Sequence, residues 1–155
     1  VFLFFYRLRN QEGAQNQVAM DTKPLEKKGV DINLKMQAYE RLTIFLERTD
    51  PWRLLSVIDK TEKNIENIES NILNVLLSEF EYNLSQQVYV SDELWNMIVA
   101  SKNQTINLIS SVKNSLKSNS KGEDFFNSLK LILQNQQITP AKIALDYLKQ
   151  EVRSI

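Results

Sequence analysis

Carboxylates at helical spacing are the side chains of this sequence best suited to chemistry. They are Glu62, Glu66 and Glu69, followed by Glu79 and Glu81. Carboxylate oxygens are ligands for Mg²⁺ or Ca²⁺, whereas a di-iron bundle site also needs histidine, and the chain has none. We interpret the run as a solvated acidic face. Residues 61–90 hold five acids and one lysine, a local net charge of −4 that suits a basic partner.

The lack of histidine and cysteine removes most other catalytic and metal chemistry. No disulfide can form, which fits a reducing compartment, and structural zinc sites and activated nucleophiles lose their usual ligands and bases. Gly13, Gly29 and Gly122 stand apart, whereas a phosphate-binding loop needs clustered glycines. An enzyme would need a carboxylate–metal site or a Lys/Tyr pair formed by the fold. We therefore expect no enzyme, no cofactor and no metal.

Aromatic and arginine side chains near the first helix are candidates for binding a protein partner. They are Tyr39, Arg41, Arg48, Trp52 and Arg53. Tyrosine, tryptophan and arginine dominate the energetics of protein interfaces. In the alternative interpretation, the arginines pair with Glu79 or Glu81 across a contact between two helices, where a buried ion pair fixes register. The sequence leaves both interpretations open.

An all-α fold, an irregular bundle of about five helices, is expected to position these residues. Three glycines and three prolines in 155 residues are too few for the turns of a β-rich fold. Apolar periodicity predicts helices over 32–48, 60–87, 91–116 and 123–136, and from 139 onward. Helix starts are indicated at Asp50-Pro51, Ser91 and Thr139-Pro140. The β-like run 87–90 reads as a linker.

The apolar stripes of the first two long helices predict how they pack. In the first helix, Met36, Tyr39 and Ile44 widen the stripe, so we expect packing on two sides. In the second helix, the expected stripe includes Val75 and Leu84.

Residues 1–9 begin with five apolar residues, followed by a tyrosine and then two arginines. This is the order found where a membrane helix leaves the bilayer on the cytoplasmic side. The expected membrane residues are Val1, Phe2, Leu3, Phe4, Phe5, Tyr6, Arg7 and Arg9. Five apolar residues are far fewer than the ~20 that span a bilayer, so we expect the rest of the helix upstream. The alternatives are an apolar helix docked on the core and, less favoured, a signal-peptide remnant. Residues 10–30 are then a tether and 31–155 a cytoplasmic helical domain.

Three stretches carry a resemblance to a known family. They are Leu34–Leu42 continuing to Phe45–Arg48, then Glu79–Val90, and finally Ala144–Arg153. Together they resemble an uncharacterised family of Bacteroidota-type bacteria, in which one N-terminal transmembrane helix precedes a cytoplasmic all-helical domain. The resemblance implies a membrane span upstream of Val1, and it supplies no activity, cofactor or site residue.

These features favour a non-enzymatic accessory or scaffold subunit, anchored in the inner membrane and binding a protein partner, for example a membrane complex, at its cytoplasmic face. Residues 1–30 carry five bases and three acids, a net charge of +2 that suits an anionic inner leaflet. The alternative is a soluble nucleic-acid or ribosome-associated factor, for which five bases among residues 121–155 would have to gather on one face. We expect no nucleic acid, because Lys plus Arg and Asp plus Glu both number 19. The oligomeric state is not predicted.

Overall fold

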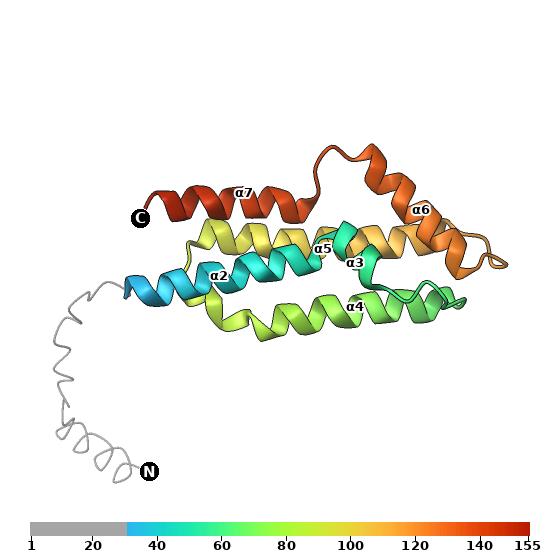
Figure 1. Cartoon of the computed structure of the whole chain (residues 1–155), viewed down its shortest axis with the longest axis horizontal. Helices are drawn as coiled ribbons and strands as arrows, with labels where there is room; N and C mark the ends of the chain where they lie inside the picture. Colours follow the sequence, from blue (N-terminus) through green and yellow to red (C-terminus); the bar gives the residue numbers. More distant parts are fainter. Residues whose placement is uncertain (1–30) are drawn as a thin grey trace, which may run out of the picture.

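The computed structural model describes residues 31–155, which form an all-α bundle with no strand in that part of the chain (Figure 1). The elements are α2 (Ile32–Thr49), α3 (Pro51–Val57), α4 (Ile65–Tyr82), the 3-10 helix η1 (Leu84–Val88), α5 (Asp92–Ser115), α6 (Gly122–Asn135) and α7 (Pro140–Arg153). The predicted all-α bundle is confirmed. The expected membrane segment 1–9 and tether 10–30 lie outside the described residues.

Four long helices, α2, α4, α5 and α7, run along the length of the bundle, and α6 crosses back over one end of it (Figure 1). Helix α7 packs on α2 and α5, α4 packs on α5, and α3 packs on α6. Helix α2 begins and α7 ends at one end of the bundle, which we call the Asp31 end. Helix α5 ends and α6 begins at the opposite end, the Gly122 end. No helix within residues 31–155 combines the length and apolar character that crossing a bilayer requires.

The buried apolar residues form two separate cores along the bundle. The core of the Asp31 end is built from α2, the first half of α5 and α7, and includes Phe45, Leu94 and Leu148. The core of the Gly122 end is built from α3, α4, the second half of α5 and α6. Between the two cores, α5 buries the polar residues Ser101 and Thr105, 3% and 1% exposed. Helix α5 is therefore shared by both cores and joins them.

Side-chain caps begin three of the helices where the sequence indicated. Asp50 accepts a hydrogen bond from the Trp52 backbone N–H (2.9 Å), and Ser91 accepts one from Leu94 (3.1 Å). Thr139 accepts one from the N–H of Lys142 at 3.2 Å. Each side chain satisfies a backbone donor that the first helical turn leaves unpaired.

The second long helix is shorter than the prediction over 60–87. Helix α4 begins only at Ile65 because Asn64 caps it, accepting the Asn67 N–H at 3.1 Å. It ends at Tyr82, and η1 follows. Upstream, Asp59 accepts hydrogen bonds from the backbone and hydroxyl of Thr61, which holds that segment in a turn.

Helix α2 packs on both α7 and α4, and Tyr39 is buried, but the prediction that Met36 and Ile44 belong to a packed face is wrong. Met36 and Ile44 are 38% and 50% exposed, while the opposite flank of the helix faces the core. Val75 and Leu84, expected in the stripe of the second helix, are also exposed. Apolar periodicity in this chain therefore includes residues that lie on the surface.

Gly122 occupies the closest backbone approach at the Gly122 end. Its N–H donates to the Lys63 carbonyl at 3.0 Å. A Cβ at this position would lie 2.1 Å from the Glu62 carbonyl oxygen and 2.8 Å from Ile68 Cδ1. Only a residue without a side chain lets the start of α6 meet the segment before α4 at this distance.

Candidate protein-interaction surface

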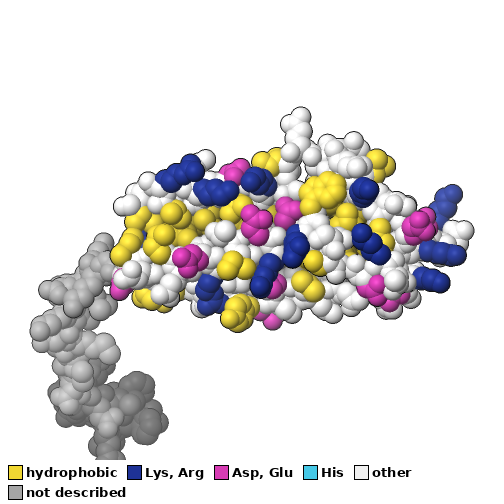
Figure 2. All heavy atoms as spheres, viewed as in Figure 1, with side chains coloured by type: hydrophobic (Ala, Val, Ile, Leu, Met, Phe, Trp, Pro, Cys, Tyr) yellow, Lys and Arg dark blue, Asp and Glu magenta, His cyan; other side chains and the backbone are white. Residues whose placement is uncertain are grey.

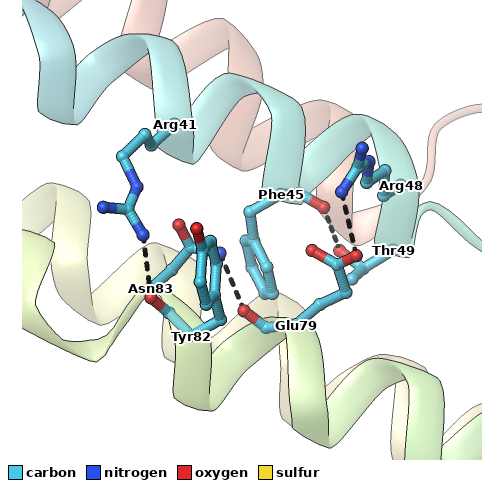
Figure 3. Close-up of polar contacts among 7 residues, drawn as sticks. All are labelled: Arg41, Phe45, Arg48, Thr49, Glu79, Tyr82 and Asn83. Atoms are coloured by element: carbon cyan, nitrogen blue, oxygen red, sulfur yellow. Dashed lines mark hydrogen bonds and ion pairs between the residues drawn. The ribbon is translucent and has the colours of Figure 1, made fainter.

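Two arginines predicted as partner contacts lie on α2, where it faces α4 (Figure 3). The Arg48 guanidinium donates to Glu79 Oε1 at 3.1 Å, which confirms the predicted pairing of an arginine on the first helix with Glu79. The Arg48 side chain is 61% exposed and that of Glu79 25% exposed. An ion pair with this much solvent contributes little stability, about 0.2–1 kcal/mol, so both groups remain available to a partner.

Arg41 holds the C-terminal end of α4 in a different way from the predicted pairing with Glu81. Its guanidinium donates to the Tyr82 carbonyl oxygen at 2.9 Å. The same guanidinium lies 4.7 Å from the centroid of the Tyr82 ring. Tyr82 itself is 74% exposed, so this cation–π contact presents the aromatic ring at the surface.

Buried groups directly beneath these arginines fix the two helices. Phe45 points from α2 toward α4 between Arg41 and Arg48 (Figure 3), and its ring lies 6.0 Å from that of Phe80. The buried Asn83 amide donates to the Glu79 carbonyl at 2.7 Å and so closes the last turn of α4. The polar groups at the surface therefore lie on two helices whose positions are fixed by buried contacts.

A hollow of about 630 Å³ opens beside the ion pair, along the outer face of α4. It is lined by Arg48, Asn74, Val75, Ser78, Glu79 and Tyr82, and we call it the α2–α4 hollow. Val75 is 46% exposed within it. It therefore combines an apolar side chain and an aromatic ring with amide, hydroxyl and charged groups, a mixture typical of surfaces that bind proteins.

The full chain, residues 1–155, matches the family described as a family of unknown function, DUF7935. The chain belongs to this family. Comparisons with curated proteins and with solved structures give no match. The expectation of an uncharacterised family is thereby confirmed, while its Bacteroidota membership and its N-terminal membrane helix stay predictions.

The other three predicted contacts lie away from the hollow. Tyr39 is buried, 3% exposed, and we leave it out of the candidate surface. Trp52 (41% exposed) and Arg53 are on α3, which packs on α6, and neither lines the hollow. The structure thus places Arg48 on Glu79 and Arg41 on Tyr82, both residues that line the hollow, whereas Trp52 and Arg53 do not line it.

The glutamates predicted to form an acidic face have mixed roles in the fold. Glu69 accepts Lys113 Nζ at 2.6 Å and the Ser110 hydroxyl at 3.0 Å, joining α4 to α5. The hydrogen bond with Glu69 is the main reason that the pKa of Lys113 is raised. Glu62 accepts the Asn64 N–H at 2.8 Å, which lowers the pKa of this carboxyl. Among residues 31–155, no three acidic side chains gather closely enough to hold a metal ion.

Sequence reasoning missed a polar network that ties three helices together at the Asp31 end. Glu151 on α7 accepts the Tyr39 hydroxyl at 2.8 Å and the Ser91 backbone N–H at 3.0 Å. The Ser91 hydroxyl also donates to Glu151. Burial, and secondly the bond to Glu151, raises the pKa of Tyr39 well above its ordinary value. The apolar spacing of Tyr39 was visible in the sequence, whereas its partner 112 residues away was not.

Proposed function

We propose that this protein is a membrane-anchored accessory or scaffold subunit that binds a protein partner through the α2–α4 hollow. The observation that carries the proposal is the exposure of Val75 and Tyr82 beside a solvent-accessible Arg48–Glu79 pair. When a partner buries exposed apolar and aromatic groups next to charged groups, the burial contributes favourable binding free energy. The residues that hold α2 against α4 lie beneath this surface, so binding need not disturb them.

The shape and charge of the hollow indicate the kind of segment that would bind. Val75 and the Tyr82 ring offer contact to an apolar or aromatic side chain, and Asn74 and Ser78 offer hydrogen bonds. The charged residues that line the hollow are one base, Arg48, and one acid, Glu79, so flanking residues of both charges on the partner fit best. We infer a protein segment with an apolar or aromatic anchor between residues of opposite charge.

The membrane part of the proposal rests on the composition of residues 1–9. Apolar residues, a tyrosine and then two arginines are the order found where a helix leaves the bilayer into the cytoplasm. Such an anchor would hold the domain beside partners in the inner membrane and raise their effective concentration, so a modest interface would be enough.

Co-purification of the full chain from membranes in mild detergent, with quantification of the bound proteins, tests the proposal. Ser78→Arg fills the hollow with a bulky charge at an exposed position. It is expected to reduce the bound partner at least about tenfold while leaving the melting temperature unchanged.

Ser111→Arg, the same substitution at an exposed position of α5, is the matched control and should retain the partner. If Ser78→Arg and Ser111→Arg recover the same proteins in the same amounts, the hollow is not the binding surface. Recovery of RNA in place of a protein would favour the nucleic-acid alternative.

A further inference from the structure

The other exposed flank of α2 forms an apolar groove with α7. The groove has a volume of about 550 Å³, and its lining includes Met36, Thr43 and Ile44 of α2 and Leu148 and Val152 of α7. Figure 2 shows hydrophobic side chains gathered over these helices toward the Asp31 end. Met36 and Ile44 are the residues that the sequence placed in a second packed face, and they are half-exposed here.

Opposite charges line the two sides of this groove, Glu40 on α2 and the half-exposed Lys149 on α7. Beyond the groove on the same two helices, Glu47 of α2 and Lys142 of α7 are also exposed. Within residues 31–155, neither glutamate takes part in an ion pair. Both lysines lie 3.9 Å from Asp146, and ion pairs this long and exposed are weak, so either lysine can pair with another acid. Lys and Arg side chains follow the α7 side of the groove in Figure 2.

The spacing of these charges is the same on both helices. Glu40 and Glu47 are seven residues apart, and so are Lys142 and Lys149. Helices α2 and α7 run in opposite directions (Figure 1), and the Tyr39–Glu151 hydrogen bond sets their register. Glu40 therefore lies at the level of Lys149, and Glu47 lies near the level of Lys142.

We propose that the α2–α7 groove binds a second copy of this chain. A two-fold axis parallel to the helices lays α2 of one copy over α7 of the other. Glu40 then faces Lys149 of the second copy, and Glu47 faces Lys142. A two-fold axis perpendicular to the helices would instead lay α2 on α2 and place like charges together. The apolar groove supplies most of the affinity, and the charges select this one arrangement.

The parallel two-fold axis also determines where the N-terminal ends of the two helical bundles lie. A two-fold axis parallel to the helices leaves the Asp31 ends of both copies on the same side of the dimer. Two chains whose preceding residues approach one membrane surface could therefore pair in this way. The perpendicular axis would send the two Asp31 ends in opposite directions.

Charge reversal tests the pairing in the full chain, with association followed by sedimentation velocity. Glu40→Lys with Glu47→Lys should weaken self-association at least about tenfold, and so should Lys142→Glu with Lys149→Glu. Mixing these two variants should restore dimers, because each copy then presents the charges that the other lacks. Glu66→Lys, a reversal at an exposed site of α4, should leave association unchanged.

Because the chain contains no cysteine, one introduced cysteine gives a clean second measurement. A mixture of Glu40→Cys and Lys149→Cys chains should form a disulfide-linked dimer on mild oxidation, because the proposed arrangement sets these two positions face to face. Chains carrying Ser78→Cys in the α2–α4 hollow should not cross-link.

A full chain that sediments as a monomer at every concentration, with no cross-link between Glu40→Cys and Lys149→Cys chains, overturns the proposal. So does association that survives both charge reversals. Either result leaves the α2–α4 hollow untouched, because Ser78→Arg tests that surface separately.

Discussion

The two ends of the bundle are joined by different kinds of contact. At the Asp31 end, α2, α5 and α7 meet around one carboxylate, Glu151, which accepts hydrogen bonds from Tyr39 and Ser91. At the Gly122 end, α6 meets the segment before α4 through a backbone contact that leaves no room for a Cβ. The first contact depends on side-chain protonation, and the second depends on shape.

Because the contacts differ, different perturbations should destabilise the two ends of the bundle. A carboxylate with three donors tolerates small changes of volume but not the loss or ionisation of a donor. A backbone contact at van der Waals distance tolerates changes of pH but not one added methyl group. The α2–α4 hollow lies outside both joints, and the α2–α7 groove meets the joint of the Asp31 end only at the buried Tyr39. Variants at the exposed residues of either surface should therefore leave the bundle intact.

The largest effect is expected from Gly122→Ala, which breaks the joint of the Gly122 end. The added Cβ meets the Glu62 carbonyl oxygen at 2.1 Å, and backbone atoms must move to relieve the contact. We expect the free energy of unfolding to fall by about 3 kcal/mol, the upper part of the usual range for overpacking. Urea unfolding followed by circular dichroism measures it.

Asn119→Ala, at an exposed position of the same loop, is the control and should change stability little. Equal stability of the Gly122→Ala and Asn119→Ala variants would show that the close approach does not constrain this end.

A smaller effect is expected from Tyr39→Phe, which removes one donor from the joint of the Asp31 end. The loss of a hydrogen bond to a charged acceptor should cost about 1.5 kcal/mol near neutral pH. Tyr147→Phe is the matched control, because Tyr147 packs beside the same core and has no hydroxyl hydrogen bond within residues 31–155.

The pH dependence of unfolding gives a second test of the Tyr39 hydrogen bond. Tyrosine in the unfolded chain ionises near its ordinary pKa of 10.0, whereas folded Tyr39 has a raised pKa. Its contribution is therefore complete below about pH 10 and is lost as the pH rises further. Unfolding midpoints between about pH 9 and pH 11.5 should fall more steeply for the native chain than for Tyr39→Phe. Lys113, whose pKa is also raised, leaves a residual alkaline loss in both. Identical slopes for the two proteins would contradict this role of Tyr39.

The smallest effect, a gain, is expected between the two cores. The Thr105 hydroxyl is buried with no hydrogen-bond partner within residues 31–155. Thr105→Val keeps the shape and removes the unpaired oxygen, so stability should rise by about 1 kcal/mol. Thr105→Ser keeps the oxygen and loses a methyl group, so it should be less stable than the native chain. A loss on Thr105→Val would mean that the hydroxyl has a partner, such as a bound water.

Local patterns in the sequence predicted the parts of this fold that depend on neighbouring residues. The caps Asp50, Ser91 and Thr139 act within three residues of themselves, and all three begin helices. The Arg48–Glu79 pair was also within reach, because two adjacent long helices must face one another somewhere.

Contacts between distant segments were not predictable in the same way. Thr139, predicted only as a cap, also donates from its hydroxyl to Asp50, 89 residues away, and so links the starts of α7 and α3. The exposure of Met36 and Ile44 was missed because periodicity marks apolar residues without showing whether another helix covers them. The α2–α7 groove is the direct result of that difference.

Helix α5 runs from one end of the bundle to the other and so sets the distance between them. Its 24 residues, at 1.5 Å per residue, span about 36 Å. The residues that follow Arg153 lie at the same end of the bundle as Asp31, and the loop before Gly122 lies at the other end (Figure 1). Fluorophores at Ile155 and Asn119 would thus mark the two extremes of one rigid spacer. If the proposed membrane attachment holds, their relative distances from a labelled lipid surface would distinguish a domain that stands upright on the membrane from one that lies flat.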